Sequence, residues 1–175
     1  MTILPRTARQ VLPGLPHHVT QRGNRRQPTF FHDGDYRLYR HLLAEHCQHA
    51  GVDVWAYSLL PNHVHLLLVP QTAGALTEAV GHTHRRYTAA INRREGWTGY
   101  LWQGRYGSEP LIHDHELLAA ARYIELNPVE AGLVRRPQDW PWSSARAHLG
   151  WQADSLLTSA ELIEIVGDWE SFLGT

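Results

Sequence analysis

The sequence is organised around one apolar stretch that contains two histidines, Leu60-Pro61-Asn62-His63-Val64-His65-Leu66-Leu67-Leu68-Val69. One residue separates the histidines, and a run of apolar residues follows them, which predicts the start of a strand. Side chains alternate between the two faces of a strand, so His63 and His65 point the same way and Val64 points the opposite way. Two imidazoles side by side can bind one metal ion. The other interpretation is two histidines that hydrogen-bond within a half-polar sheet face.

The segments around this stretch predict a sheet with two helices. A tight turn at Pro61 and Asn62 joins the histidine-containing strand to the strand before it, so these two strands form a hairpin. The predicted elements are strand 17–22, a helix of about fifteen residues between Asp33 as N-cap and Gly51, strands 52–59 and 63–69, helix 77–94 and a strand within 101–112. This order predicts an α+β fold, a ferredoxin-like βαββαβ antiparallel sheet with both helices on one face.

A third helix is expected at residues 115–127. Asp114 is its candidate N-cap, and Pro128 should end it, because the residue before a proline avoids the α region. Tyr123 and Asn127 are four residues apart on this helix and therefore share a face. One interpretation is that the Tyr123 hydroxyl and the Asn127 amide are presented together as functional groups. The other is that Tyr123 packs in the core and Asn127 is an ordinary residue at a helix end. Spacing alone favours the second interpretation.

The chain length of 175 residues suits one domain with a sizeable core. Residues 1–15 contain prolines and a glycine and should form an irregular lead-in. A segment rich in Trp and Pro at 137–142 and a short amphipathic helix at 159–169 follow the third helix. The expected organisation is one domain at 1–147 and a helical C-terminal extension at 148–175.

The composition is that of an ordinary folded chain with an unusual choice of basic residue. Hydrophobic residues make up 43% of the sequence, charged residues make up 19%, and the formal net charge is −1. All 16 basic residues are arginine, whose planar guanidinium binds phosphate through paired hydrogen bonds and stacks on bases. This favours a nucleic-acid partner, although a GC-rich genome would produce the same bias.

Cysteine usage and hydropathy exclude several other classes of protein. Cys47 is the only cysteine, so neither an intrachain disulfide nor a thiolate zinc cluster can form. No segment approaches the roughly 18 apolar residues of a membrane span, and the N-terminus lacks a signal-peptide core. We therefore expect a soluble cytoplasmic protein with no membrane partner.

Several motifs occur in a specific order along the chain. The stretch at 60–67 is followed by Tyr123-Ile124-Glu125-Leu126-Asn127-Pro128 and then by Trp142-Ser143-Ser144. Together they resemble the REP-associated tyrosine transposases, relatives of the single-tyrosine HUH transposases of insertion sequences (transposase IS200-like). His18-Val19-Thr20-Gln21-Arg22-Gly23-Asn24 and Leu101-Trp102-Gln103-Gly104-Arg105-Tyr106 fit the same pattern. The resemblance runs from about residue 13 to about residue 147 and marks domain 1–147 as an HUH nuclease.

The resemblance implies a metal-dependent transposase that cleaves and rejoins single-stranded DNA at hairpin-forming repeats. It assigns Tyr123 as the nucleophile, which forms a 5′-phosphotyrosine intermediate. It makes His63 and His65, with Asn127 as a third polar ligand, the site of Mg²⁺ or Mn²⁺. The alternative is a catalytically inactive protein that keeps the fold and binds structured nucleic acid. The complete set of four residues favours the enzyme.

The side chains expected to contact DNA lie after the first strand, on the second helix, before the fourth strand and beside the nucleophile. They are Arg22, Asn24, Arg25, Arg26, Arg85, Arg86, Gln103, Arg105 and Arg122. A solvated role for Arg122 is equally open. Tyr and Trp interleaved with Arg suit base stacking on unpaired strands. The expected partner is single-stranded DNA that carries a hairpin, bound by a monomer or a homodimer.

Overall fold

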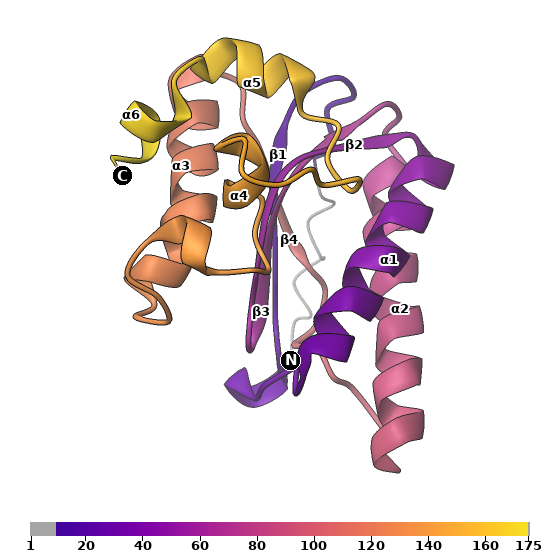
Figure 1. The fold of residues 1–175 in the computed structure, drawn as a ribbon. Helices are drawn as coiled ribbons and strands as arrows, with labels where there is room; N and C mark the ends of the chain where they lie inside the picture. The colour runs from indigo at the N-terminus through magenta and orange to yellow at the C-terminus, as the bar shows by residue number, and fades with distance from the viewer. Residues whose placement is uncertain (1–9, 175) are drawn as a thin grey trace, which may run out of the picture.

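The computed structural model describes residues 10–174 of the chain (Figure 1). Residues 10–16 form neither helix nor strand, as predicted for the lead-in. The rest of the predicted lead-in and the prediction that the N-terminus lacks a signal-peptide core lie outside the described residues. Within the described part of the chain, no helix is long and apolar enough to cross a membrane.

A four-stranded antiparallel sheet forms the centre of the fold. Its strands are β1 (His17–Arg22), β2 (Val52–Leu60), β3 (His63–Pro70) and β4 (Gly107–Pro110), in the order β2-β3-β1-β4. Helix α1 (Asp33–Ala50) connects β1 to β2, and α2 (Ala75–Glu95) connects β3 to β4. The predicted βαββαβ order is therefore confirmed, with the histidine-containing strand β3 in the interior of the sheet.

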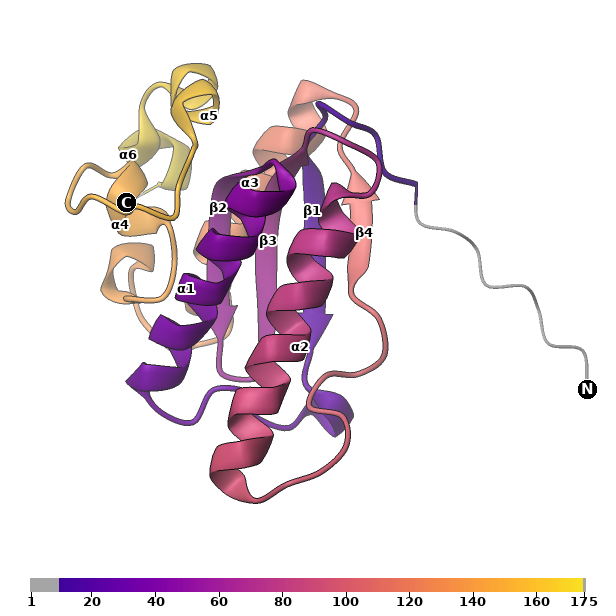
Figure 2. The ribbon, with the colours of Figure 1, turned by 90° about the vertical axis from the view of Figure 1, so that its right-hand side faces the viewer.

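Two layers of helices cover the sheet (Figures 1 and 2). Helices α1 and α2 pack together on one face, as predicted, and α3 (Asp114–Glu130) covers the other face. The alternation of β3 supplies both cores: Val64, Leu66 and Leu68 belong to the core under α1 and α2, whereas Leu67 and Val69 belong to the core under α3. Burying each such side chain stabilises the fold by roughly 1.5–3 kcal/mol.

The prediction that Pro128 ends the third helix is wrong. Helix α3 continues through Pro128 to Glu130. Proline lacks only its own N–H, so a proline in the last turn removes one helical hydrogen bond and leaves the following ones in place. The carbonyl of Asn127 still accepts from the Ala131 N–H at 2.9 Å, and that of Pro128 accepts from Leu133 at 2.9 Å.

Both predicted N-caps are displaced by one residue. The N-cap of α1 is His32 instead of Asp33, and that of α3 is His113 instead of Asp114. In each helix a carboxylate of the first turn accepts a backbone N–H from just before the helix: Asp35 accepts from Phe31 at 2.9 Å, and Glu116 accepts from its N-cap residue His113 at 3.0 Å. Each of these carboxylates lies two residues after the predicted cap, Asp33 or Asp114.

The C-terminal segment forms three short helices instead of one amphipathic helix. These are α4 (Ala145–His148), α5 (Ala160–Val166) and α6 (Trp169–Leu173). The predicted helix at 159–169 is interrupted at Gly167, which has a φ of +71°, a conformation that side-chain-bearing residues rarely adopt. Helices α5 and α6 lie beside the upper part of α3 in Figure 1.

A buried polar network joins α3 to this C-terminal segment. The carboxylate oxygen Oε1 of Glu125 accepts hydrogen bonds from Ser144 Oγ and from His148 Nδ1, both at 2.5 Å. His148 Nε2 lies 3.0 Å from Ser159 Oγ, and the His148 ring stacks on Trp169 at 4.1 Å between centroids. Since all these groups are buried, losing one partner would leave the others unpaired, and the network fixes α3 against the extension.

His84 makes the stability of the fold depend on pH. It is buried on α2, where its Nε2 lies 3.0 Å from the Tyr39 hydroxyl and its ring stacks on Trp102. Burial lowers the pKa of His84 from 6.5 to about 3. The unfolded chain binds this proton as the pH falls below 6.5 and the folded protein does not, so the free energy of unfolding decreases by about 1.4 kcal/mol per pH unit over that interval.

Urea denaturation of the wild type and of His84→Gln, each at about pH 7.5 and about pH 5.5, tests this dependence. The glutamine can still accept from Tyr39 but does not titrate. We expect the free energy of unfolding of the wild type to fall by about 1 kcal/mol more than that of the variant between the two conditions. An identical decrease in both proteins would show that His84 is not responsible.

Candidate active site

The two histidines of β3 lie on the sheet face that α3 covers. In the antiparallel pairing of β1 with β3, Arg22 lies opposite His63 and Thr20 lies opposite His65. Directly opposite residues place their side chains on the same face of a sheet, so Arg22 and Thr20 flank the histidines. The alternation predicted for His63 and His65 is confirmed by this pairing.

Helix α3 brings Tyr123 and Asn127 against the histidine pair. The ring centroids of His63 and His65 are 5.0 Å apart, and the Tyr123 ring stands edge-on to His65 at 5.3 Å. One turn further on along α3, the buried Asn127 side chain is close enough to the His63 ring to affect the pKa of that histidine. Tyr123 is 42% exposed, which leaves it accessible to a large substrate. The four residues selected from the sequence therefore form one cluster.

His65 is held by a further histidine, His18 of β1. His18 Nε2 lies 3.0 Å from His65 Nδ1, and the two rings stack at 5.2 Å between centroids. His65 Nε2 is buried and has no hydrogen-bond partner among the described residues. Burial, together with the charges of neighbouring groups such as His18, lowers the pKa of His65 to about 3, so the ring is neutral near pH 7. In the tautomer that donates Nδ1–H to His18, Nε2 of His65 carries a free lone pair.

Asn62 orients the ring of His63 in the same way. His63 Nδ1 donates to Asn62 Oδ1 at 2.7 Å, and Asn62 Nδ2 donates to the Arg26 carbonyl at 3.1 Å. An amide oxygen only accepts, so the Nδ1 atom carries the proton and the neutral ring has its lone pair on Nε2. Burial and, after it, the charge of Arg22 lower the pKa of His63, which favours the neutral ring.

The donor atoms of this cluster fit a divalent ion. Each histidine has its Nδ1 engaged by an outer partner and its Nε2 available, which is the usual arrangement of metal-binding histidines. Residues 10–174 contain no group of three His, Cys, Asp or Glu side chains placed to hold a metal. An ion here would therefore need the Asn127 amide oxygen as its third protein ligand, with its other positions open to substrate oxygens.

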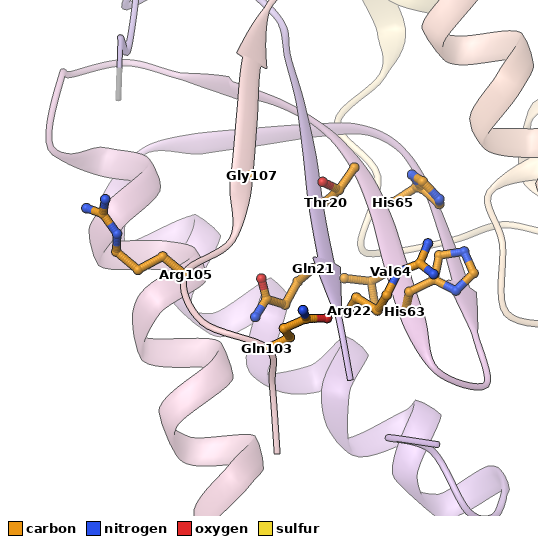
Figure 3. A pocket seen from close by; sticks show the side chains of 9 residues that line it. All are labelled: Thr20, Gln21, Arg22, His63, Val64, His65, Gln103, Arg105 and Gly107. Carbon is orange, nitrogen blue, oxygen red and sulfur yellow. The ribbon is translucent and has the colours of Figure 1, made fainter. Parts of the chain in front are cut away.

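An open hollow of about 310 Å³ adjoins the histidines (Figure 3). Gln103 reaches it because its backbone N–H donates to the Arg22 carbonyl at 2.8 Å. Arg105 also lines the hollow, but in Figure 3 its side chain extends away from the two histidines. The lining residues are Thr20, Gln21, Arg22, His63, Val64, His65, Gln103, Arg105 and Gly107. Three of the residues predicted to contact DNA, Arg22, Gln103 and Arg105, thus line the hollow beside the candidate site.

Three more of the predicted DNA contacts, Asn24, Arg25 and Arg26, lie immediately after β1. They form the short 3₁₀ turn η1 (Asn24–Arg26), at the same end of the sheet as His63. Arg25 and Arg26 have positive φ angles of 53° and 59° and exposed side chains. The hydrogen bond from Asn62 to the Arg26 carbonyl connects this turn to the histidine pair.

The structure does not bring the remaining three predicted DNA contacts to the cluster. Arg85 and Arg86 lie on α2, across the sheet from α3, and Arg86 pairs with Glu45 at 2.7 Å. Arg122 turns away from the neighbouring Tyr123, and its Nε donates to the Phe172 carbonyl at the end of α6 at 2.9 Å. Neighbours in sequence on a helix point in directions about 100° apart, so being adjacent to Tyr123 does not place Arg122 at the site.

Sequence reasoning missed two residues of the cluster, His18 and Asn62. Asn62 directly precedes His63 in the sequence, and this adjacency could have indicated that the two side chains interact. His18 is 47 residues from His65, and only the register between β1 and β3 brings the two rings together. Nothing in the spacing of His18 distinguishes it from its neighbour His17.

The chain is similar to a set of known DNA-acting proteins. The family model described as transposase IS200 like matches residues 13–127. A putative REP-associated tyrosine transposase of Haemophilus influenzae is 27% identical over 116 residues, covering 61% of this chain and 66% of the relative. A REP-associated tyrosine transposase of Escherichia coli K12 is 23% identical over 110 residues, covering 62% of this chain and 64% of the relative. The match thus spans slightly less than two thirds of each relative's length.

A solved structure has the same fold. It is described as a REP-associated tyrosine transposase bound to a REP hairpin, and it superimposes with a TM-score of 0.67 over 86% of this chain and 93% of its own length, at 21% identity. The resemblance to REP-associated tyrosine transposases found in the sequence motifs is confirmed by these relatives. Since the family model covers well over half of the residues, the chain belongs to the family of IS200-like transposases.

Proposed function

We propose that the protein is a transposase that cleaves and rejoins single-stranded DNA at hairpin-forming repeats, with Tyr123 as nucleophile. The observation that carries the proposal is the cluster itself. An exposed tyrosine stands 5.3 Å from the His65 ring, and both histidines have an available Nε2 next to a buried amide. A protein that only binds DNA does not need this combination.

In the proposed reaction the Tyr123 oxygen attacks a backbone phosphorus. A bond forms between the tyrosine oxygen and phosphorus, the bond from phosphorus to the 3′ oxygen breaks, and the proton lost by the tyrosine balances the one gained by the leaving 3′-hydroxyl. The product is a 5′-phosphotyrosine link. A 3′-hydroxyl of another strand can reverse the step, so cleavage and joining use the same residues and need no ATP.

Three groups of the cluster would assist this step. His63, His65 and Asn127 would hold Mg²⁺ or Mn²⁺, which when bound withdraws charge from the scissile phosphate. Arg22, opposite His63 on β1, would contact a neighbouring phosphate oxygen with its guanidinium. The stacked His18 and the Asn62 amide keep the two imidazoles in the required orientation.

The proposed partner is DNA with a hairpin. Support comes from the relatives described as REP-associated tyrosine transposases and from the solved structure of the same fold, described as bound to a REP hairpin. An open site at one end of a sheet, with arginines beside it, suits a nucleic-acid strand better than a small molecule. We propose either a monomer or a homodimer as the active assembly.

Covalent capture with two matched oligonucleotides tests the function. Both carry the same hairpin from a repeat of the source genome with unpaired flanks; one is labelled at its 3′ end and the other at its 5′ end. With Mn²⁺, we expect the 3′ label to migrate with the protein on a denaturing gel and the 5′ label to be released, because the tyrosine keeps the 5′ phosphate. EDTA should prevent both results.

The competing function, a binding protein without catalysis, predicts a different result. Such a protein would shift the hairpin on a native gel and leave both labels free on the denaturing gel, across a panel of repeat hairpins. A 5′ label that migrates with the protein would instead indicate a 3′-linked intermediate and would contradict the proposed polarity.

A further inference from the structure

Two large aromatic side chains, Trp97 and Tyr100, are exposed in the loop between α2 and β4. Trp97 is 49% exposed and Tyr100 is 89% exposed. The next two residues of the same loop, Leu101 and Trp102, are buried in the core. The loop therefore buries one pair of apolar side chains and presents another pair to solvent.

Contacts with neighbouring residues hold this loop and its exposed rings in place. The Phe31 ring stands edge-to-face against Trp97, with 5.6 Å between the ring centroids, and the Arg94 guanidinium lies over the Phe31 ring at 5.9 Å from its centroid. The Asn92 side chain donates to the Gly99 carbonyl at 3.0 Å, which ties the loop to the end of α2. The aromatic rings are thus presented by an anchored loop.

The loop adjoins the two-arginine turn η1. The Asn24 backbone N–H donates to the Leu101 carbonyl at 2.8 Å, and its side chain reaches the Tyr100 carbonyl at 3.5 Å. Arg25 and Arg26 are exposed, and neither forms an ion pair with any residue of the described part of the chain. Two uncompensated guanidinium groups therefore lie beside the exposed aromatic residues.

The same turn connects this surface to the proposed catalytic cluster. Asn62 binds the Arg26 carbonyl through Nδ2 and His63 through Oδ1. Gln103, which follows Leu101 and Trp102 in the aromatic loop, donates its backbone N–H to the Arg22 carbonyl. This hydrogen bond brings the loop to the edge of the hollow. A strand whose phosphate lies at the histidines can therefore continue over η1 toward Tyr100 and Trp97.

We propose that Trp97 and Tyr100, with Arg25 and Arg26, form a docking surface for unpaired nucleotides of the DNA strand. The inference rests on the proposed function and names the part of the substrate that this surface binds. Bases inside a duplex are stacked on each other, whereas unpaired bases expose their faces to aromatic rings. The arginines complement the negative charge of the strand's phosphates. Stacking tolerates any base, so this surface would add affinity for single strands without reading their sequence.

Equilibrium binding of three fluorescent probes tests the surface. The probes are an oligothymidylate of about eight nucleotides, a blunt hairpin, and the same hairpin with an unpaired extension of that length, which matches the few nucleotides per module seen in single-strand binding proteins. We expect Tyr100→Ala and Trp97→Ala to bind the oligothymidylate and the extended hairpin at least about fivefold more weakly, and the blunt hairpin with unchanged affinity.

Two further variants separate stacking from charge and from general surface effects. Arg25→Gln should lower the slope of log affinity against log salt by about 0.7 for the single strand, whereas Tyr100→Ala should leave that slope unchanged. Trp151→Ala is the matched control, because Trp151 is also an exposed tryptophan, at 58%, but lies in the C-terminal segment. It should bind all three probes like the wild type.

The outcomes distinguish this surface from the proposed catalysis. If neither aromatic substitution weakens single-strand binding, or if the blunt hairpin is weakened equally, the inference is wrong even where the covalent adduct forms; a surface for a protein partner would give this result. If single-strand binding weakens as expected but the wild type forms no adduct, the surface stands and the catalytic proposal fails.

Discussion

Replacing Tyr123 with phenylalanine is expected to reduce formation of the covalent DNA adduct by at least about 10³-fold and to leave hairpin affinity unchanged. The substitution removes only the hydroxyl oxygen. The phenyl ring retains the edge-on contacts of Tyr123 with His65 and with His18, whose ring centroid lies 6.0 Å away, so the helix and the histidines should stay in place. The rate of adduct formation on the denaturing gel and the dissociation constant of the hairpin are the two measurements.

The control for this prediction is Trp151→Phe, which alters an exposed aromatic side chain outside both the cluster and the proposed docking surface. It should form the adduct at the wild-type rate. An undiminished adduct in Tyr123→Phe would assign the nucleophile to another residue. Peptide mapping of the wild-type adduct would then identify that residue directly.

Replacing His65 with alanine is expected to weaken Mn²⁺ binding by more than about 100-fold and to abolish the adduct, because loss of a ligand should exceed the 10–100-fold effect of losing an outer partner. The Nε2 atom of His65 is buried without a hydrogen-bond partner in the described residues, and the proposed metal ion would bind this atom. Titration calorimetry with Mn²⁺ in the absence of DNA measures this loss independently of activity.

A pair of substitutions at His18 tests how the ligand is oriented. His18→Leu removes the hydrogen-bond partner that lies 3.0 Å from His65 Nδ1, and we expect Mn²⁺ affinity to fall by about 10–100-fold. His18→Gln places an amide oxygen where Nε2 stood and should restore most of that affinity. If His65→Ala binds Mn²⁺ as tightly as the wild type, His65 is not a ligand and the proposed metal site is wrong.

Much of the fold follows from local patterns in the sequence. The short turn at Pro61 and Asn62 forces β2 and β3 to pair, and the alternation along β3 places His63 and His65 together whatever surrounds them. The four-residue spacing of Tyr123 and Asn127 places both on one face of a helix in the same way. These relations need no knowledge of distant residues, and all of them hold in the structure.

Distant contacts decide which of the predicted DNA-contacting residues lie near the cluster. Arg122 is adjacent to Tyr123 in sequence, but its guanidinium donates to a backbone carbonyl at the end of α6, 50 residues away. Arg85 and Arg86 lie on α2, which packs on the opposite face of the sheet. Which face a helix covers is decided by packing of the whole domain and leaves no mark in the helix's own sequence.

By itself, the sequence determined the order of the elements, the shared face of the two histidines and the pairing of a tyrosine with an asparagine on one helix, because strand alternation, helix periodicity and short turns act between near neighbours. Only the tertiary structure decided that α3 would lie over those histidines, that His18 and Asn62 would orient them, and that Trp97 and Tyr100 would stand beside Arg25 and Arg26. These meetings depend on strand register and on helix placement. Both are set by how the entire core packs, and no segment read alone contains them.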